Sequence, residues 1–287
     1  MTINKLLLPG KILNPNQILE NDSRLDYRLK ELNIEKNLGE QNNNEIKISP
    51  SSSLNEKYQH IAEQEPDVEK MMNNLFEDVE LLENIDEDKI SIIGEDNNEI
   101  DIYISKPKNY NSTLPCILHI HGGGMGLMGA DTICYKFWRN YLASKNLLVI
   151  GVDFRNSAGR LGNYRYPSGL NDCMSTLHWV NNNKKDLNIS KVIISGESGG
   201  GNLSLALSLK VNKENKNNLV QGTYALCPYI YGDYLNRDPK LPSLTENDNY
   251  FIDTNFGAIL ASVYNVDSNY KDDFLAWPYW ADEINLK

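Results

Sequence analysis

The chain has few cysteines, no long apolar run and no recognisable leader, and each absence excludes a class of protein. Its four cysteines lie far apart and form no C-x-x-C pair, which argues against a zinc site or a disulfide scaffold and favours reduced thiols. No segment approaches the ~20 apolar residues that span a bilayer. The first residues lack the apolar stretch of a signal peptide. We therefore expect a cytoplasmic protein with no membrane span.

The chain also has fewer basic than acidic side chains. Lysine and arginine number 28 against 39 acidic residues, which gives a formal net charge of −11. An acidic surface repels phosphate backbones and anionic lipid headgroups, so we do not expect nucleic acid or membrane surfaces as partners. A hydrophobic content of 40% in 287 residues is that of a globular chain with one large domain, or one domain and a small appendage.

The N-terminal part of the chain is polar and irregular, apart from two stretches with helical spacing of apolar side chains. The first predicted helix is RLDYRLKELNI, residues 24–34. The second covers residues 67–85, with Pro66 near its start, where a missing N–H does no harm. Residues 41–53 between them are expected to form a linker.

From about residue 88 the apolar pattern becomes that of strands. Residues 89–107 alternate around a turn at 96–98, which predicts a hairpin. Buried apolar runs then alternate with helical stretches: CILHIH, LLVIGVDF and KVIIS, with a fourth strand in GTYALCPY. This order predicts an α/β fold, a mostly parallel sheet with helices on both faces and the hairpin at one edge. The loops after CILHIH and KVIIS, at strand carboxyl ends, are where we expect the chemistry.

A nucleophilic serine is predicted directly after the third buried run. The sequence there reads GESGG, which is G-x-S-x-G at a strand-to-helix junction. Such a serine, here Ser198, occupies a sharp turn that projects its hydroxyl into the cleft, and side chains two residues away would collide with the turn. The positive end of the following helix favours the negative charge that develops there.

The loop after the first buried run predicts an oxyanion hole. It reads HGGGMGLMG, and glycine lets backbone N–H groups approach a developing oxyanion closely. Gly123, Gly124 and Gly199 are the candidate donors. We expect His121 to hold the loop in shape rather than to move protons, and His119 to pack in the core.

The same loop admits a second interpretation. Residues 124–129 fit G-x-G-x-x-G after a strand, and Asp153 ends the next strand, about where a ribose-binding carboxylate is expected. That motif leaves the glycine triplet unexplained, and an independent serine junction lies two strands later. Dinucleotide binding is therefore the weaker alternative.

The motifs HGGGMG, VDFRN, YPSGLNDC and GESGGGNL together resemble the hormone-sensitive-lipase-like carboxylesterases of the α/β-hydrolase superfamily, from about Ser91 onward. The resemblance implies hydrolysis of carboxylic esters through an acyl-serine at Ser198, with a small-molecule ester substrate and no metal or organic cofactor. It implies supporting roles for Gly122, Glu197 and Asp153, with Arg155 structural beside the last. Glu197 and Gly199 replace the commoner Asp and Ala, a chemically mild change.

The resemblance also implies a domain division. Residues 1–85 would be an N-terminal helical cap region and linker, and residues 86–287 an incomplete hydrolase core. A second cap segment would be inserted at about 240–268. The aromatic side chains of Trp277, Tyr279 and Trp280 are expected to pack in the core or at its edge rather than to line a pocket.

One departure from the family is large. The family order is Ser, then Asp or Glu, then His, whereas all four histidines of this chain precede Ser198. The chain therefore looks C-terminally truncated, with the last strands of the sheet missing. Without a base a serine hydroxyl is a weak nucleophile, so this chain is expected to be impaired or inactive, and His121 is a poor substitute on the oxyanion side.

Three explanations fit this departure. The chain is a fragment of an esterase, its sheet is completed by a separate C-terminal polypeptide, or it is a non-catalytic ligand- or partner-binding protein that kept the pocket. An apolar edge strand near YALCPY predicts self-association or a complementing partner.

Overall fold

The structure is a computed structural model that describes residues 10–12, 14–36, 48–266 and 269–286. The chain divides into two compact units. One consists of residues 1–52 with 233–259, and the other of residues 53–232 with 260–287. Helix α7 (Thr254–Tyr264) crosses the division.

The second unit contains the sheet. Its strands are β1 (Ile85–Ile93), β2 (Glu99–Pro107), β3 (Leu114–Ile120), β4 (Leu148–Val152), β5 (Ile189–Glu197) and β6 (Gly222–Leu226). Its helices are α2 (Leu54–Phe76), α3 (Ile133–Ala143), α4 (Ser168–Asn182) and α5 (Gly199–Lys213), with 3₁₀ turns at Asn217–Leu219 and Pro278–Trp280.

The sheet has the strand order β1-β2-β4-β3-β5-β6. The expected hairpin is present: β1 pairs with β2 in antiparallel fashion, and β2 lies antiparallel to β4 at one edge. The other strands are parallel, and β4 is buried along its whole length. The predicted mostly parallel α/β sheet is confirmed.

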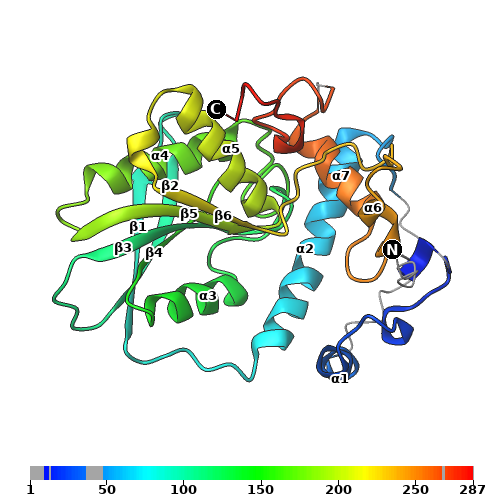
Figure 1. Cartoon of the computed structure of the whole chain (residues 1–287), viewed down its shortest axis with the longest axis horizontal. Coiled ribbons are helices and arrows are strands. Elements are labelled where there is room, and N and C mark those ends of the chain that lie inside the picture. Colours follow the sequence, from blue (N-terminus) through cyan, green and yellow to red (C-terminus); the bar gives the residue numbers. More distant parts are fainter. Residues whose placement is uncertain (1–9, 13, 37–47, 267–268, 287) are drawn as a thin grey trace, which may run out of the picture. The chain divides into compact units, whose positions relative to one another are not determined.

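The connections explain why helices cover both faces. The chain moves from β3 to β4 in one direction across the sheet, then from β4 to β5 and from β5 to β6 in the other. Because parallel crossovers are right-handed, this reversal puts α3 on one face and α4 and α5 on the opposite face, as Figure 1 shows.

The second predicted helix is wrong in its bounds. Helix α2 begins after Ser53, whose side chain and Glu56 form a reciprocal capping box, and it ends at Phe76. Pro66 is therefore inside the helix rather than near its start, and it removes one backbone hydrogen bond. The burial of Ile61 and the hydrogen bonds of Glu65, both in the turns just before Pro66, offset this loss.

The segment after α2 is not helical, so Val79 and Leu82 lie outside the helix that was expected to include them, and both are partly exposed. Of the expected linker, residues 41–47 lie outside the described residues. Ser53, its last residue, is instead the N-cap of α2.

The first unit is held together by polar contacts between its two chain segments. It contains α1 (Tyr27–Glu35), where the first helix was expected, and α6 (Ser243–Glu246). The Asp22 carboxylate accepts hydrogen bonds from the Arg24 guanidinium and the Tyr250 hydroxyl. The Arg24 hydrogen bond is the main reason that the pKa of Asp22 lies well below its usual range. The assignment of these segments to a cap stays a prediction.

Candidate active site

The two loops singled out by the sequence lie side by side at the carboxyl edge of the sheet. Strands β3 and β5 are neighbours in parallel register, with Ile120 opposite Gly196. The chain leaves β3 toward one face of the sheet and β5 toward the other, and in open α/β sheets such a reversal is where ligands bind. The sheet topology alone therefore brings the glycine loop (residues 121–129) to the serine turn (residues 196–200).

Ser198 has the backbone conformation of a sharp, strained turn. Its φ is +53° and its ψ is −118°, in a region that side-chain-bearing residues rarely adopt. Its N–H donates to the Leu226 carbonyl at 3.0 Å, and its own carbonyl accepts from Tyr229 N at 2.9 Å. The turn is thus fixed between β5 and the end of β6, at the N-terminus of α5.

Glycine is needed on both sides of the turn because backbone passes very close. A Cβ on Gly196 would lie 2.6 Å from the Ile120 carbonyl oxygen, and one on Gly200 only 2.0 Å from the same atom. A Cβ on Gly196 would also lie 2.4 Å from the Gly200 carbonyl oxygen, so the expected collision involves both the turn itself and the end of the neighbouring strand β3.

The glycine loop touches the serine turn directly. A Cβ on Gly199 would lie 2.7 Å from the Gly124 nitrogen and 2.5 Å from the Met125 nitrogen. A Cβ on Gly122 would lie 3.5 Å from the Ser198 Cβ. The structure therefore brings Gly122, Gly124, Gly199 and Ser198 together, and the predicted arrangement of the two bends is present.

The N–H groups proposed as oxyanion donors are available in this arrangement. Gly123 has φ +97° and Gly124 φ +60°, so the loop turns back on itself there. In the part of the chain that the structure describes, neither N–H donates to another backbone group. Gly199 is the first residue of α5, whose N–H has no intrahelical acceptor. Their role as donors stays a prediction.

Several side chains hold the glycine loop at successive backbone groups. The Met125 carbonyl accepts from both the N–H and the hydroxyl of Ser157, at 2.8 and 3.0 Å. Asn156 Nδ2 donates to the Met128 carbonyl at 2.7 Å, and the Met128 N–H donates to Glu65 Oε1 at 2.6 Å. The loop is therefore pre-shaped from outside the glycine motif itself.

Asp153 contacts the end of this loop. Its Oδ1 accepts from the Ala130 N–H at 2.5 Å and its Oδ2 from the Tyr103 hydroxyl at 3.3 Å. Burial is the main cause that raises the pKa of this carboxyl. Both oxygens are thus occupied by the protein, which fits the supporting role expected of Asp153 and leaves the ribose-binding alternative without its acceptor.

Glu197, the residue before the proposed nucleophile, is paired with His119. Strand register places His119 opposite Ser195, so Glu197 follows two residues later on the same face. The His119 Nε2 lies 3.0 Å from Glu197 Oε2. His119 is fully buried and packs beside Tyr135 of α3. The expected core position of His119 is confirmed.

His121 is held as a neutral ring inside the protein. Its imidazole is fully buried, stacks on Phe154 with ring centres 4.2 Å apart, and has Nδ1 2.8 Å from the Gly122 carbonyl. Burial lowers the pKa of His121 to about 3. A ring so weakly basic and so fixed supports the expectation that His121 shapes the loop rather than accepting the serine proton.

This burial predicts a pH dependence of stability. Between the unfolded pKa of about 6.5 and the folded value of about 3, unfolded His121 binds a proton that the folded state excludes. The free energy of unfolding should therefore fall by about 1.4 kcal/mol per pH unit as the pH drops below 6.5. We expect the free energy of unfolding, measured by denaturation between pH 6.5 and 5, to show this slope. His121→Asn should remove it.

His178→Asn is the control for this measurement. His178 lies on α4 beside Lys216, and burial also lowers its pKa, but the ring is only partly buried. Its replacement should change the slope less than His121→Asn does. Equal slopes in wild type and His121→Asn would contradict the neutral, buried state of His121.

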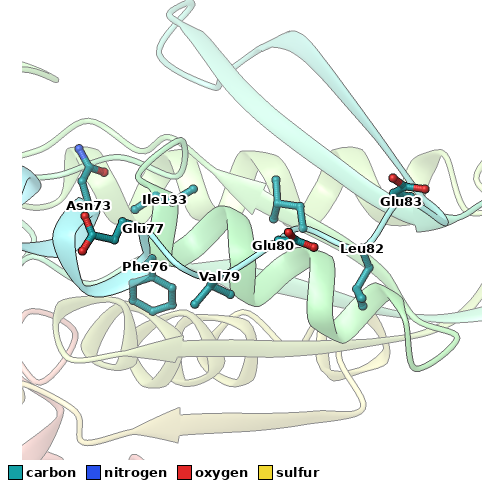
Figure 2. A pocket seen from close by; sticks show the side chains of 9 residues that line it. Asn73, Phe76, Glu77, Val79, Glu80, Leu82, Glu83 and Ile133 are labelled. Carbon is teal, nitrogen blue, oxygen red and sulfur yellow. The ribbon is translucent and has the colours of Figure 1, made fainter. Parts of the chain in front are cut away.

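A separate open cavity of about 730 Å³ lies away from the serine turn. Its size is within the roughly 300–1,000 Å³ of ligand pockets. It is lined by Asn73, Phe76, Glu77, Val79, Glu80, Leu81, Leu82, Glu83 and Ile133. Figure 2 shows that most of these side chains come from the end of α2 and the segment that follows it. None belongs to the serine turn or the glycine loop, so this cavity has no part in the candidate chemistry.

The aromatic residues near the C-terminus lie mostly in packed surroundings, as expected. Trp277 is fully buried, with ring centres of Tyr229 and Tyr264 each 5.5 Å away. Trp280 donates through Nε1 to the Tyr231 carbonyl and stacks on that ring. Tyr279 is 39% exposed and packs edge-on against Trp280 at the rim.

Two features are absent from the residues that the structure describes. Across residues 10–12, 14–36, 48–266 and 269–286, no three His, Cys, Asp or Glu side chains are grouped so that they could hold a metal ion. In the same ranges, none of the helices combines the length and the apolar character that crossing a lipid bilayer requires.

Three residues that shape the site were missed by the sequence analysis. Asn156 is the last residue of VDFRN and Ser157 follows it, so their neighbourhood was identified but their hydrogen bonds to the glycine loop were not. Glu65 comes from α2, and nothing in its sequence context marks it as a contact of a loop more than sixty residues away.

Comparison with known proteins agrees with this geometry. Residues 117–287 match the model of a family described as alpha/beta hydrolase fold. The carboxylesterase NlhH of Mycobacterium tuberculosis is 27% identical over 181 residues, which are 62% of this chain and 49% of that protein. The gibberellin receptor GID1B of Arabidopsis thaliana is 28% identical over 155 residues, 52% of this chain and 40% of that protein. The chain thus spans about half the length of these curated relatives.

Solved structures resemble it over more of its length. Brefeldin A esterase, described as a bacterial homologue of human hormone sensitive lipase, has a TM-score of 0.90 and 29% identity, covering 98% of this chain and 79% of that one. Esterase Est22 has a TM-score of 0.80 and 31% identity, covering 93% of this chain and 78% of that one.

Proposed function

Because the chain belongs to the family described as alpha/beta hydrolase fold, we propose that it is the nucleophile-bearing part of a carboxylic ester hydrolase. Ser198 Oγ attacks the ester carbonyl carbon, the alcohol leaves, and water then hydrolyses the acyl-serine. The N–H groups of Gly123, Gly124 and Gly199 stabilise the oxyanion that forms in each step. The substrate is a small carboxylic ester, and the location is cytoplasmic.

One observation carries the proposal. The strained turn at Ser198 and the glycine loop are in contact, so a carbonyl carbon at the serine would place its oxygen beside free backbone N–H groups at a helix N-terminus. Glu197, His119, His121, Gly122 and Asp153 support these two bends through the contacts described above.

The proton of the serine hydroxyl has to pass to a base during attack. No histidine follows Ser198 in the 287 residues. Loss of the histidine of a triad typically removes about six orders of magnitude of rate. Turnover by this chain alone is therefore proposed to be strongly impaired.

The same observation favours a second function, a non-catalytic protein that binds a ligand or partner at the retained pocket. Similarity to a protein named as a gibberellin receptor supports a binding role. The outer strand β6, with Tyr224 58% and Leu226 47% exposed, supports a partner that adds to this edge, either a second copy or a complementing C-terminal polypeptide.

The test is covalent labelling of the purified chain with a serine-directed fluorophosphonate, together with hydrolysis of a short chromogenic ester. Because no histidine follows Ser198 to take its proton, we expect both labelling of Ser198 and turnover to be slow, and both to be abolished in Ser198→Ala. The matched control is Ser208→Ala, on the same helix α5, whose hydroxyl bonds to Ser204 and Thr223. If folded wild type is neither labelled nor hydrolyses the ester, the hydrolase proposal is wrong and the non-catalytic binding protein is the remaining proposal.

A further inference from the structure

A carboxylate from outside both motifs is built into the glycine loop. Glu65, in the middle of α2, is 4% exposed. Its Oε1 accepts from the Met128 N–H at 2.6 Å and its Oε2 from the Arg160 N–H at 2.6 Å. One side chain therefore joins the loop that follows β3 to the loop that follows β4.

The chemistry of this contact requires a carboxylate. Both partners are backbone donors, and hydrogen bonds to an ionised acceptor are shorter and stronger than neutral ones. Each oxygen has its own N–H, which compensates for burying the charge. The guanidinium of Arg160 is directed elsewhere, to Glu69 and Asp131. A glutamine at position 65 would turn an N–H group toward one of the two donors.

The position of the contact connects it to the proposed oxyanion donors. The Gly126 and Leu127 N–H groups both donate to the Gly123 carbonyl, which closes a tight turn through Gly124. Met128 is the next residue and has a left-handed φ of +70°. Fixing the Met128 N–H therefore fixes the far end of the turn whose near end carries Gly123 and Gly124.

We propose that Glu65 is a positioning residue for the oxyanion loop: through Met128 and Arg160 it holds the Gly123 and Gly124 N–H groups toward Ser198. This inference rests on the proposed function of that loop. It adds a residue of the N-terminal helix α2 to the determinants of reaction rate, although Glu65 touches neither substrate nor reacting atoms.

The chain supplies a matched pair of variants. Glu65→Gln keeps the size of the side chain and removes one charge. Glu69→Gln makes the same change one helical turn later, where the carboxylate, 31% exposed, binds the Arg160 side chain rather than backbone. We expect the fluorophosphonate to label Ser198 about 10- to 100-fold more slowly in Glu65→Gln. Glu69→Gln should label within about twofold of wild type.

Amide hydrogen exchange separates positioning from loss of fold and does not depend on reactivity. In wild type the Met128 and Arg160 amides should exchange slowly. In Glu65→Gln at least one of them should become fast, and the Gly123 and Gly124 amide resonances should shift. Amides of β3 and β5 should keep their protection, which shows that the sheet is intact.

The outcomes distinguish this inference from the proposed function. Wild type that is neither labelled nor hydrolyses the ester contradicts the proposed function, and the exchange pattern still decides whether Glu65 positions the loop. Equal labelling of the two variants in a labelling-competent protein would overturn the role of Glu65. Should Glu65→Gln not fold, fast exchange of Met128 and Arg160 in wild type would overturn it, and slow exchange would uphold it.

Discussion

Replacing Gly200 by alanine is expected to lower the free energy of unfolding by about 3 kcal/mol or more. The new Cβ would lie 2.0 Å from the Ile120 carbonyl oxygen and 2.5 Å from that of His121, and both are backbone atoms at the end of β3. Neither atom can move without separating α5 from the sheet. The measurement is a chemical denaturation curve of Gly200→Ala beside wild type.

Gly201→Ala is the control for Gly200→Ala. Gly201 is the next residue of α5, and its Cβ would meet Pro228 at 3.1 Å, a contact that needs only a small adjustment. Alanine also stabilises a helix interior relative to glycine by about 1 kcal/mol. We expect a change below about 1 kcal/mol. A Gly200→Ala protein as stable as Gly201→Ala would show that the turn does not approach β3 this closely.

Asp172→Asn is expected to cost about 3 kcal/mol of folding free energy. Asp172, in α4, is 1% exposed and accepts from the Arg155 N–H and from the Arg155 guanidinium. It also accepts from Asn98 Nδ2 in the β1–β2 turn. An asparagine would leave the mostly buried guanidinium with the exposed Asp96 as its remaining carboxylate partner, and would weaken the contact shared by the loop after β4, the hairpin turn and α4.

The second carboxylate on Arg155 supplies the comparison. Asp96 bonds to the same guanidinium, but its side chain is 41% exposed. Asp96→Asn should therefore cost less than about 1 kcal/mol, as surface ion pairs do. Similar denaturation midpoints for Asp172→Asn and Asp96→Asn would mean that the buried Asp172–Arg155 pair contributes no more to stability than the exposed Asp96–Arg155 pair.

The features predicted correctly from the sequence are those encoded by local pattern. The runs containing Leu118, Ile150 and Ile194 are mostly apolar because their strands are covered on both faces, and all three side chains are fully buried. The serine turn and the glycine loop were identified because each needs glycine at fixed positions. Their contact follows from the pairing of β3 with β5, which the alternation of strands and helices does not specify.

The start of α2 was missed although the sequence contains its signal. Ser53 and Glu56 form a capping box, but the polar run before them resembled a linker, and Pro66 resembled a helix start. A proline inside a helix is tolerated here because tertiary contacts outweigh local preference. The contact of Glu65 with Met128 had no signal at all, because it depends on how a distant helix packs against a loop.

The exposed edge of strand β6 should affect how cellular quality control treats the protein. Its outer side has no neighbouring strand among the described residues, and it presents Tyr224 and Leu226 to water. Chaperones and quality-control proteases act on exposed apolar side chains and unpaired strand edges of this kind. For as long as nothing pairs with β6, the abundance of the chain should be set by how quickly that surface is sequestered, and not only by its thermodynamic stability.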